Sequence, residues 1–274
     1  MTEVISPFFD LDENNVVDNS ITEFEYLEYL PRDSNNMNKA VQHIIETRDE
    51  DVYLLPHKAF LEVRGRLQTA ANNANYAAND AISLVNNGWS LFQSAQYQLN
   101  NKSVEDVNDY LPYASTILNL IMFSDDYSRS TASNMLWFRD TSTGGPNLKV
   151  NQVAVDGGGD LNAVRTGLHN AIAAYNANRT ANLGFSSRHI ITTGNKQISL
   201  FLPLSQIFGF CKDITTVFRG VNHSLLLDRA VPNDYIMKAN AVGDGKFNIE
   251  HISLWIPKVI PSLDIQTELE AKLV

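Results

Sequence analysis

Cysteine is almost missing from this chain: Cys211 is the only one among 274 residues. A lone cysteine excludes an intrachain disulfide and any zinc site built from several cysteines. Its apolar neighbours Phe208, Phe210 and Ile214 predict a buried thiol that packs as a small hydrophobic group and is not a catalytic nucleophile.

Basic residues are also few, with 21 Lys and Arg against 31 Asp and Glu and a formal net charge of -10. The basic residues are scattered, which argues against wrapping nucleic acid, because neutralising phosphates requires clustered Lys and Arg. Charged residues make up only 19% of the chain and hydrophobic residues 44%. Together these values predict a substantial core and a large surface that is covered by neighbouring molecules.

Long apolar runs are absent, and no stretch of the sequence approaches the length of a membrane span. The first residues, 1–7, carry no basic region followed by an apolar run. We therefore expect synthesis in the cytosol.

Motifs of catalysis and metal binding are missing too. The histidines have no close pair of metal-ligand spacing, and no Gly-x-Ser-x-Gly segment occurs. Gly157-Gly158-Gly159 lacks a Walker lysine, and Asp10-Leu11-Asp12 lacks the glycine and glutamate of a calcium loop. We predict no catalytic residues, no cofactor and no metal ligands, and therefore no enzyme. The histidines are His43, His57, His169, His189, His223 and His251.

What the sequence does contain is short strands. In 60–67, Leu61, Val63 and Leu67 alternate with Glu62, Arg64 and Arg66, which is the two-residue period of a strand. Antiparallel strands with few helices and long loops imply a sandwich or a jelly roll. The predicted strands are 20–29, 40–45, 53–55, 59–67, 92–99, 188–192, 196–201, 216–219, 225–229 and 247–256.

Two helices are expected between these strands. Tyr113, Ile117, Leu120 and Ile121 fall at helical spacing in 112–123, and a second amphipathic stripe follows in 161–176. The glycine-rich 141–159 between them predicts a long loop. We divide the chain into an N-terminal arm, 1–20, and a jelly-roll domain, 21–274, with a loop and helix insertion around 141–186.

Three groups of segments, in order, resemble the major capsid proteins of double-jelly-roll DNA viruses, especially of Polinton and adintovirus-like elements. The first is Val85-Asn86-Asn87, then Ser90-Leu91-Phe92, then a strand ending in Leu99-Asn100. The second runs from Leu111-Pro112-Tyr113 to Leu136-Trp137-Phe138-Arg139-Asp140-Thr141. The third is 198–204, followed by Ile207-Phe208, Gly220-Val221-Asn222 and 234–237.

The resemblance implies an all-β fold, an eight-stranded antiparallel jelly-roll sandwich with two or three short helices in inter-strand insertions. It also implies a structural capsid protein that assembles through lateral surfaces into pseudo-hexagonal capsomers of an icosahedral shell. The implied partners are further copies in trimers or hexamers, a second jelly-roll protein, and penton or minor capsid proteins, without direct nucleic-acid binding or a membrane span. The implied location is the virion capsid, after synthesis in the host cytoplasm.

The chain departs from this family in two ways. The match corresponds to the first barrel only, so the second barrel would be a separate polypeptide, another copy or a lost part. Gly88-Trp89 also stands where relatives carry a longer insertion with a histidine, which leaves the virus lineage open.

Two alternatives remain at this stage. A host-domesticated or lectin-like jelly-roll binding module predicts a cleft with converging aromatic side chains. A jelly-roll oxygenase requires two histidines and a carboxylate that meet inside the barrel.

Overall fold

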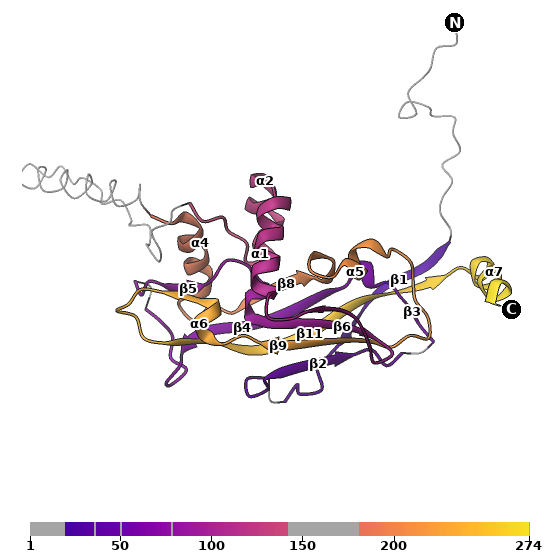
Figure 1. The fold of residues 1–274 in the computed structure, drawn as a ribbon, viewed down its shortest axis with the longest axis horizontal. Coiled ribbons are helices and arrows are strands. Elements are labelled where there is room, and N and C mark those ends of the chain that lie inside the picture. The colour runs from indigo at the N-terminus through magenta and orange to yellow at the C-terminus, as the bar shows by residue number, and fades with distance from the viewer. Residues whose placement is uncertain (1–19, 36, 50, 78, 142–180, 274) are drawn as a thin grey trace, which may run out of the picture.

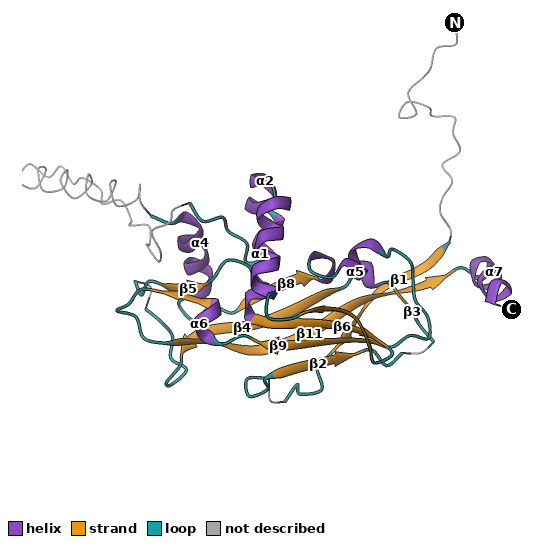
Figure 2. Ribbon diagram, in the orientation of Figure 1, coloured by secondary structure: helices purple, strands orange, loops and turns teal. Residues whose placement is uncertain are grey.

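Two antiparallel sheets form the body of the protein (Figures 1 and 2). The computed structural model describes residues 20–35, 37–49, 51–77, 79–141 and 181–273. The first sheet has the order β1-β11-β4-β8, formed by Ile21–Tyr29, Gly245–Pro261, Phe60–Thr69 and Ile198–Pro203. The second has the order β2-β9-β6-β7, formed by Gln42–Glu46, His223–Arg229, Phe92–Leu99 and Lys102–Val107.

These strand orders are those of a jelly roll. Along the chain, the eight strands change sheet at every connection except the hairpin between β6 and β7. This pattern is a pair of Greek keys rolled into a two-sheet sandwich. The predicted jelly roll is therefore confirmed, although eleven strands are described and not eight. The three additional short strands are β3 (Tyr53–Leu54), β5 (Ile82–Leu84) and β10 (Ile236–Lys238).

The core lies between the sheets and follows the alternation of the strands. In β4, Leu61, Val63 and Leu67 point inward and are buried, as their period predicts. In β11 the alternation changes phase, because the register with β4 shifts between Ile249 and His251. Near the end of β11, Trp255 lies on the outer face of the sheet and is partly exposed.

Six α-helices are described, more than the two or three expected. The prediction of a strand at 188–192 was wrong because this segment is the second half of α4, whose first turn is capped by the Asn182 side chain accepting from the Phe185 amide. The predicted strand at 216–219 contributes only an isolated bridge, Leu54 to Phe218. The helices are α1 (Leu111–Met122), α2 (Asp125–Arg129), α4 (Leu183–Thr192), α5 (Gly209–Asp213), α6 (Pro232–Tyr235) and α7 (Leu263–Leu273).

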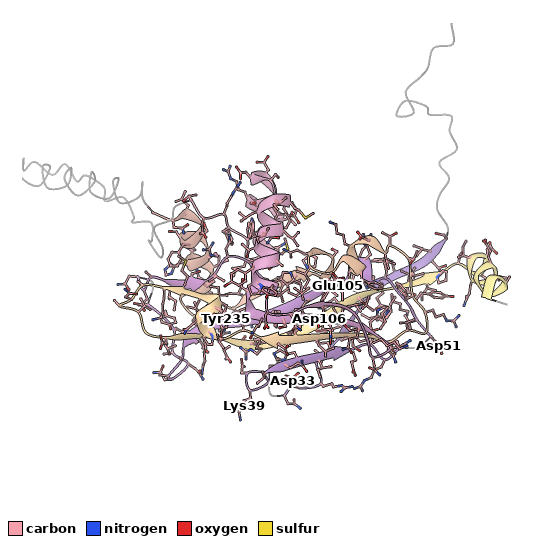
Figure 3. All side chains as sticks on the ribbon, in the orientation of Figure 1. Asp33, Lys39, Asp51, Glu105, Asp106 and Tyr235 are labelled. Atoms are coloured by element: carbon pink, nitrogen blue, oxygen red, sulfur yellow. The ribbon has the colours of Figure 1, made fainter. Side chains whose placement is uncertain are left out.

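The helices α1, α2, α4 and α5 lie along one edge of the roll, which is the upper edge in Figure 1. Glu105 on β7, labelled in Figure 3, ties α5 to the roll because its carboxylate accepts from the amides of Gly209 and Phe210, each at 2.9 Å. The expected arm at 1–20, except its last residue, and the predicted loop and helix between 142 and 180 lie outside the described residues.

A buried histidine predicts stability that is lost in acid. His223 begins β9, is fully buried, and its Nδ1 lies 2.8 Å from the Tyr97 hydroxyl. Burial lowers the pKa of His223 from 6.5 to about 4. Between these pH values the unfolded chain takes up a proton that the folded chain does not, so stability falls as the pH falls from 6.5 toward 4. We expect this group to reduce the free energy of unfolding by up to about 3 kcal/mol.

Urea titrations of the wild-type protein and of His223→Gln at several pH values measure this effect. The variant should lose less stability on acidification than the wild type. Burial also lowers the pKa of His43, but His43 is present in both proteins. The difference between the two stability curves therefore reports on His223 alone. Parallel stability curves for the two proteins would contradict the assignment.

Candidate assembly surfaces

One candidate site is a polar cluster on the outer face of the first sheet. Glu28 on β1, Glu62 on β4 and His251 on β11 bring their ligand-type atoms within 4.8 Å of one another. His251 Nε2 lies 2.8 Å from Glu28 Oε1 and 3.1 Å from Ser253 Oγ. Sequence analysis missed this cluster because the three residues come from strands that only the fold makes neighbours.

The cluster is closed by contacts within the protein. Arg64 Nε lies 2.9 Å from Glu62 Oε1, and the Trp255 indole N–H donates to Glu62 Oε2 at 2.9 Å. Both oxygens of the buried carboxylate therefore have a partner, and the guanidinium balances its charge. The three side chains thus belong to a network of polar contacts that joins β1, β11 and β4. Among the described residues this is the only group of three potential metal ligands, and its single histidine does not match the two-histidine set of an oxygenase.

A second surface on the same sheet is a row of aromatic side chains, which we call the aromatic strip. It consists of Phe24 and Tyr26 on β1, Phe60 on β4, Phe201 on β8 and Trp255 on β11. Ring centroids of neighbouring members lie 5.4 to 6.2 Å apart. The strip thus crosses all four strands of the sheet.

The aromatic strip is open to solvent: Phe24, Tyr26 and Phe201 are 43%, 38% and 39% exposed. An antiparallel sheet with one face on the core normally carries polar residues on the other face. Contiguous exposed aromatic rings on that face are typical of a surface that meets another protein.

A groove extends from the strip toward the helices. Phe60, Phe201, Tyr127 of α2 and Met135 lie in its lining, and its volume is about 350 Å³. The groove therefore connects the sheet surface with α2 and the turn that follows it.

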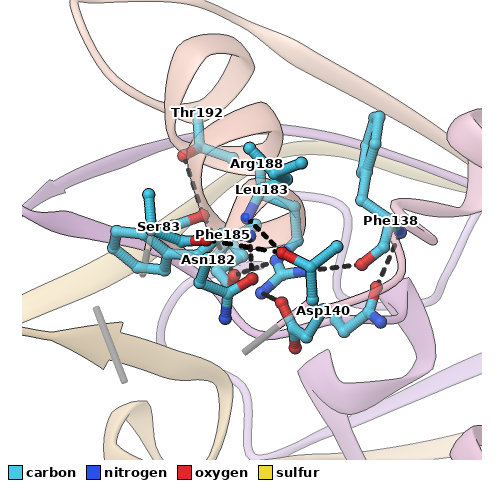
Figure 4. A network of polar contacts seen from close by, with 12 residues as sticks. Ser83, Phe138, Asp140, Asn182, Leu183, Phe185, Arg188 and Thr192 are labelled. Carbon is cyan, nitrogen blue, oxygen red and sulfur yellow. Dashed lines mark hydrogen bonds and ion pairs between the residues drawn. The ribbon is translucent and has the colours of Figure 1, made fainter. Parts of the chain in front are cut away.

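A buried arginine fastens the helical edge to the roll (Figure 4). Arg188 of α4 is fully buried and donates to the Leu84 carbonyl at 3.1 Å, the Phe138 carbonyl at 2.8 Å and Asp140 Oδ1 at 3.0 Å. Burial lowers the pKa of Arg188, and the Asp140 carboxylate opposes this shift. These contacts join α4 to β5 and to residues 138–140, so Arg188 positions α4 on the roll. Sequence analysis missed this role because it placed Arg188 at the start of a strand.

The predicted burial of Cys211 is confirmed. Burial is the main cause that raises the pKa of this thiol to about 12, and the charge of Glu105 adds to it. A thiol with such a pKa stays protonated near neutral pH, so it is a poor nucleophile.

The sequence matches no family model and no curated protein. The fold is similar to solved viral capsid structures at low identity. A chain of the Sputnik virophage structure shares 11% identity at a TM-score of 0.49, covering 96% of this chain and 53% of that chain. The Faustovirus major capsid protein shares 8% identity at a TM-score of 0.46, and the match covers 93% of this chain and 57% of that chain. The mavirus major capsid protein shares 12% identity at a TM-score of 0.43, and the match covers 88% of this chain and 47% of that chain. The chain therefore spans about half the length of the structures it matches.

In the part of the chain that the structure describes, no helix is long and apolar enough to cross a membrane.

Proposed function

We propose that this protein is a structural capsid protein of the major-capsid type, which assembles through the side faces of its jelly roll. The aromatic strip carries the proposal, because an outer sheet face with five neighbouring aromatic rings needs a protein partner to cover it. The jelly-roll strand order and the three sequence segments that resemble double-jelly-roll capsid proteins support the same function. The low fraction of charged residues, 19%, agrees with extensive contacts between copies.

The finer parts of this function belong to the proposal as well. Copies form trimers or hexamers of pseudo-hexagonal shape, with the second barrel supplied by another jelly roll. Penton or minor capsid proteins are further partners, and the assembled protein resides in the virion after synthesis in the host cytoplasm. Its function is mechanical, without catalysis, bound cofactor or direct contact with nucleic acid, for which a net charge of -10 is unfavourable.

A substitution at the β8 end of the strip tests the proposal. Phe201→Asp places a carboxylate on the surface that is to be buried, where its desolvation is costly, and should convert oligomers into monomers. Val217→Asp is the matched control, because Val217 is also 39% exposed and lies outside the strip.

Sedimentation velocity over micromolar concentrations, with electron microscopy of the largest species, measures the outcome. We expect oligomers for the wild type and for Val217→Asp, and monomers for Phe201→Asp with unchanged circular dichroism. A wild-type protein that sediments as a monomer at all concentrations would refute autonomous assembly through this face.

The groove gives one observation in favour of a second function, a binding module. Its walls bring together Phe60, Tyr127 and Phe201, as expected for a cleft that holds an apolar ligand segment. A monomeric protein that retains a partner through this groove would favour the binding module over the capsid protein.

A further inference from the structure

Helix α1 is attached to the roll by a polar face. Of its twelve residues, Leu111, Ser115 and Asn119 are buried. The Asn87 side chain donates to Ser115 Oγ at 2.6 Å, and Ser115 Oγ donates to the Leu111 carbonyl at 2.6 Å. Gln206 donates to Asn119 on the next turn. The side of α1 that faces the protein is therefore held mostly by hydrogen bonds.

The opposite side of α1 is apolar and faces solvent. We call it the α1 stripe: Tyr110 and Tyr113, each 70% exposed, with Ile117, Leu120 and Ile121 at 56%, 51% and 77%. Sequence analysis predicted the helix and the helical spacing of Tyr113, Ile117, Leu120 and Ile121, and both are confirmed. The usual arrangement, in which the apolar stripe packs on the core, is reversed here.

The spacing of the stripe is that of a helix–helix contact. Steps of three, four and three residues connect Tyr110, Tyr113, Ile117 and Leu120, which is the alternation of the two seam positions in a heptad. Ser115 and Asn119 then fall on the positions that a paired helix normally turns to solvent. The helix thus presents its pairing seam outward over a length of about 18 Å.

The stripe is also large enough to require a partner. At about 150–250 Å² per aromatic side chain, its two tyrosines alone expose on the order of 200–350 Å². The three aliphatic side chains are each more than half exposed and add to this area. The sum reaches the size of the largest apolar patch on a typical monomer, about 300–600 Å². With Leu118 and Met122 at its edges, the surface approaches the roughly 800 Å² that each partner buries in a standard interface.

We propose that the α1 stripe pairs with the α1 stripe of a second copy of this chain. No acidic or basic side chain lies within α1, so two stripes can meet without burying a charge, although each copy carries a net charge of -10. That net charge disfavours nucleic acid and anionic membranes, which attract basic surfaces. A seam with heptad spacing is complementary to itself, so the same patch serves both copies.

This contact deepens the proposed function, because it names a second surface by which copies of a capsid protein hold one another. The aromatic strip lies on the outer face of a sheet, whereas α1 projects from the edge of the roll (Figure 1). A copy can therefore engage one neighbour through its strip and another through its α1 stripe. The pairing itself requires only the exposure, the spacing and the uncharged character of the stripe.

Disulfide cross-linking of the full chain tests the pairing. Ile117 lies at the middle of the stripe, so in Ile117→Cys the new thiols face each other whether the two helices run parallel or antiparallel. Cys211 contributes no background, because it is buried and its pKa is raised to about 12. Val231→Cys is the matched control, since Val231 is 55% exposed and precedes α6 on another part of the roll.

We expect Ile117→Cys to form a disulfide-linked dimer, seen on non-reducing gels after mild oxidation, roughly a hundredfold faster than Val231→Cys at the same micromolar concentration. An interface raises the effective concentration of the two thiols to the millimolar range, whereas the control relies on random encounter. Equal rates for the two variants would overturn the pairing.

The same cross-linking on the Phe201→Asp background separates this inference from the proposed function. If oligomers that require Phe201 form but Ile117→Cys does not cross-link, the α1 pairing is wrong and the capsid proposal stands. If Ile117→Cys cross-links while assembly does not depend on Phe201, the pairing stands and the proposed use of the strip fails.

Discussion

Trp137→Ala should lower the free energy of unfolding by about 3–5 kcal/mol. Trp137 is 1% exposed, and its ring meets the Phe123 ring edge-on at a centroid distance of 6.1 Å. Removing the indole deletes buried apolar surface and leaves a cavity between α1 and the roll, which the surrounding backbone cannot fill. Because small domains have a total stability of about 5–15 kcal/mol, this single change can consume a large part of it.

Urea unfolding at neutral pH measures this effect, provided that the dependence on denaturant is unchanged. Ser90→Ala is the control, since it removes only one oxygen from a buried turn of the same core and should cost far less. If Trp137→Ala unfolds at the wild-type urea concentration, the segment around Trp137 does not belong to the core.

Arg188→Met should destabilise the protein by about 2–4 kcal/mol, because two backbone carbonyls lose their donor and an unsatisfied buried polar group costs roughly 1–3 kcal/mol. Methionine fills much of the volume of the arginine stem, so the main loss is the set of hydrogen bonds. The carbonyls of Leu84 and Phe138 lose the N–H donors that the guanidinium supplies. The Asp140 carboxylate is partly exposed, and water can replace its lost partner.

Arg139→Met is the matched control, because Arg139 also pairs with an aspartate, Asp125, but both side chains are exposed. Exposed pairs contribute about 0–1 kcal/mol, so this variant should unfold close to the wild type. Limited proteolysis adds a local readout: Arg188→Met should expose cleavage sites around α4 before the roll unfolds. Equal unfolding midpoints for the two variants would show that the buried contacts of Arg188 do not hold α4 in place.

The boundaries of several elements could be predicted from local pattern. The strand predicted at 92–99 is β6, and the period of 60–67 identified both β4 and its buried side. In each case the side chains of neighbouring positions differ strongly in polarity, so the alternation by itself predicts a strand. Where a run of β-branched residues lies in a helix, as in Ile190, Ile191 and Thr192, local preference indicated a strand and was wrong. Contacts of Arg188 and His189 with the carbonyls of β5 outweigh that preference.

The candidate surfaces could be predicted only in part. Every residue of the aromatic strip is visible in the sequence, but Phe24, Phe60, Phe201 and Trp255 become neighbours only because β1, β11, β4 and β8 adopt the jelly-roll order. The cluster of Glu28, Glu62 and His251 is hidden for the same reason, and the shift of register near His251 adds to it. Such contacts join residues that are remote in the chain, and no local period encodes them.

By itself the sequence determined what depends on neighbouring residues: the antiparallel strands, the helix at α1, the uncharged character of that helix and the burial of the lone cysteine. Only the tertiary structure decided which faces remain open. The α1 stripe has the spacing of a core-facing helix, yet hydrogen bonds through Ser115 and Asn119 hold the other face against the roll and turn the stripe outward. A helical period specifies that one face is apolar, but whether that face meets the core or solvent depends on the long-range contacts that orient the helix.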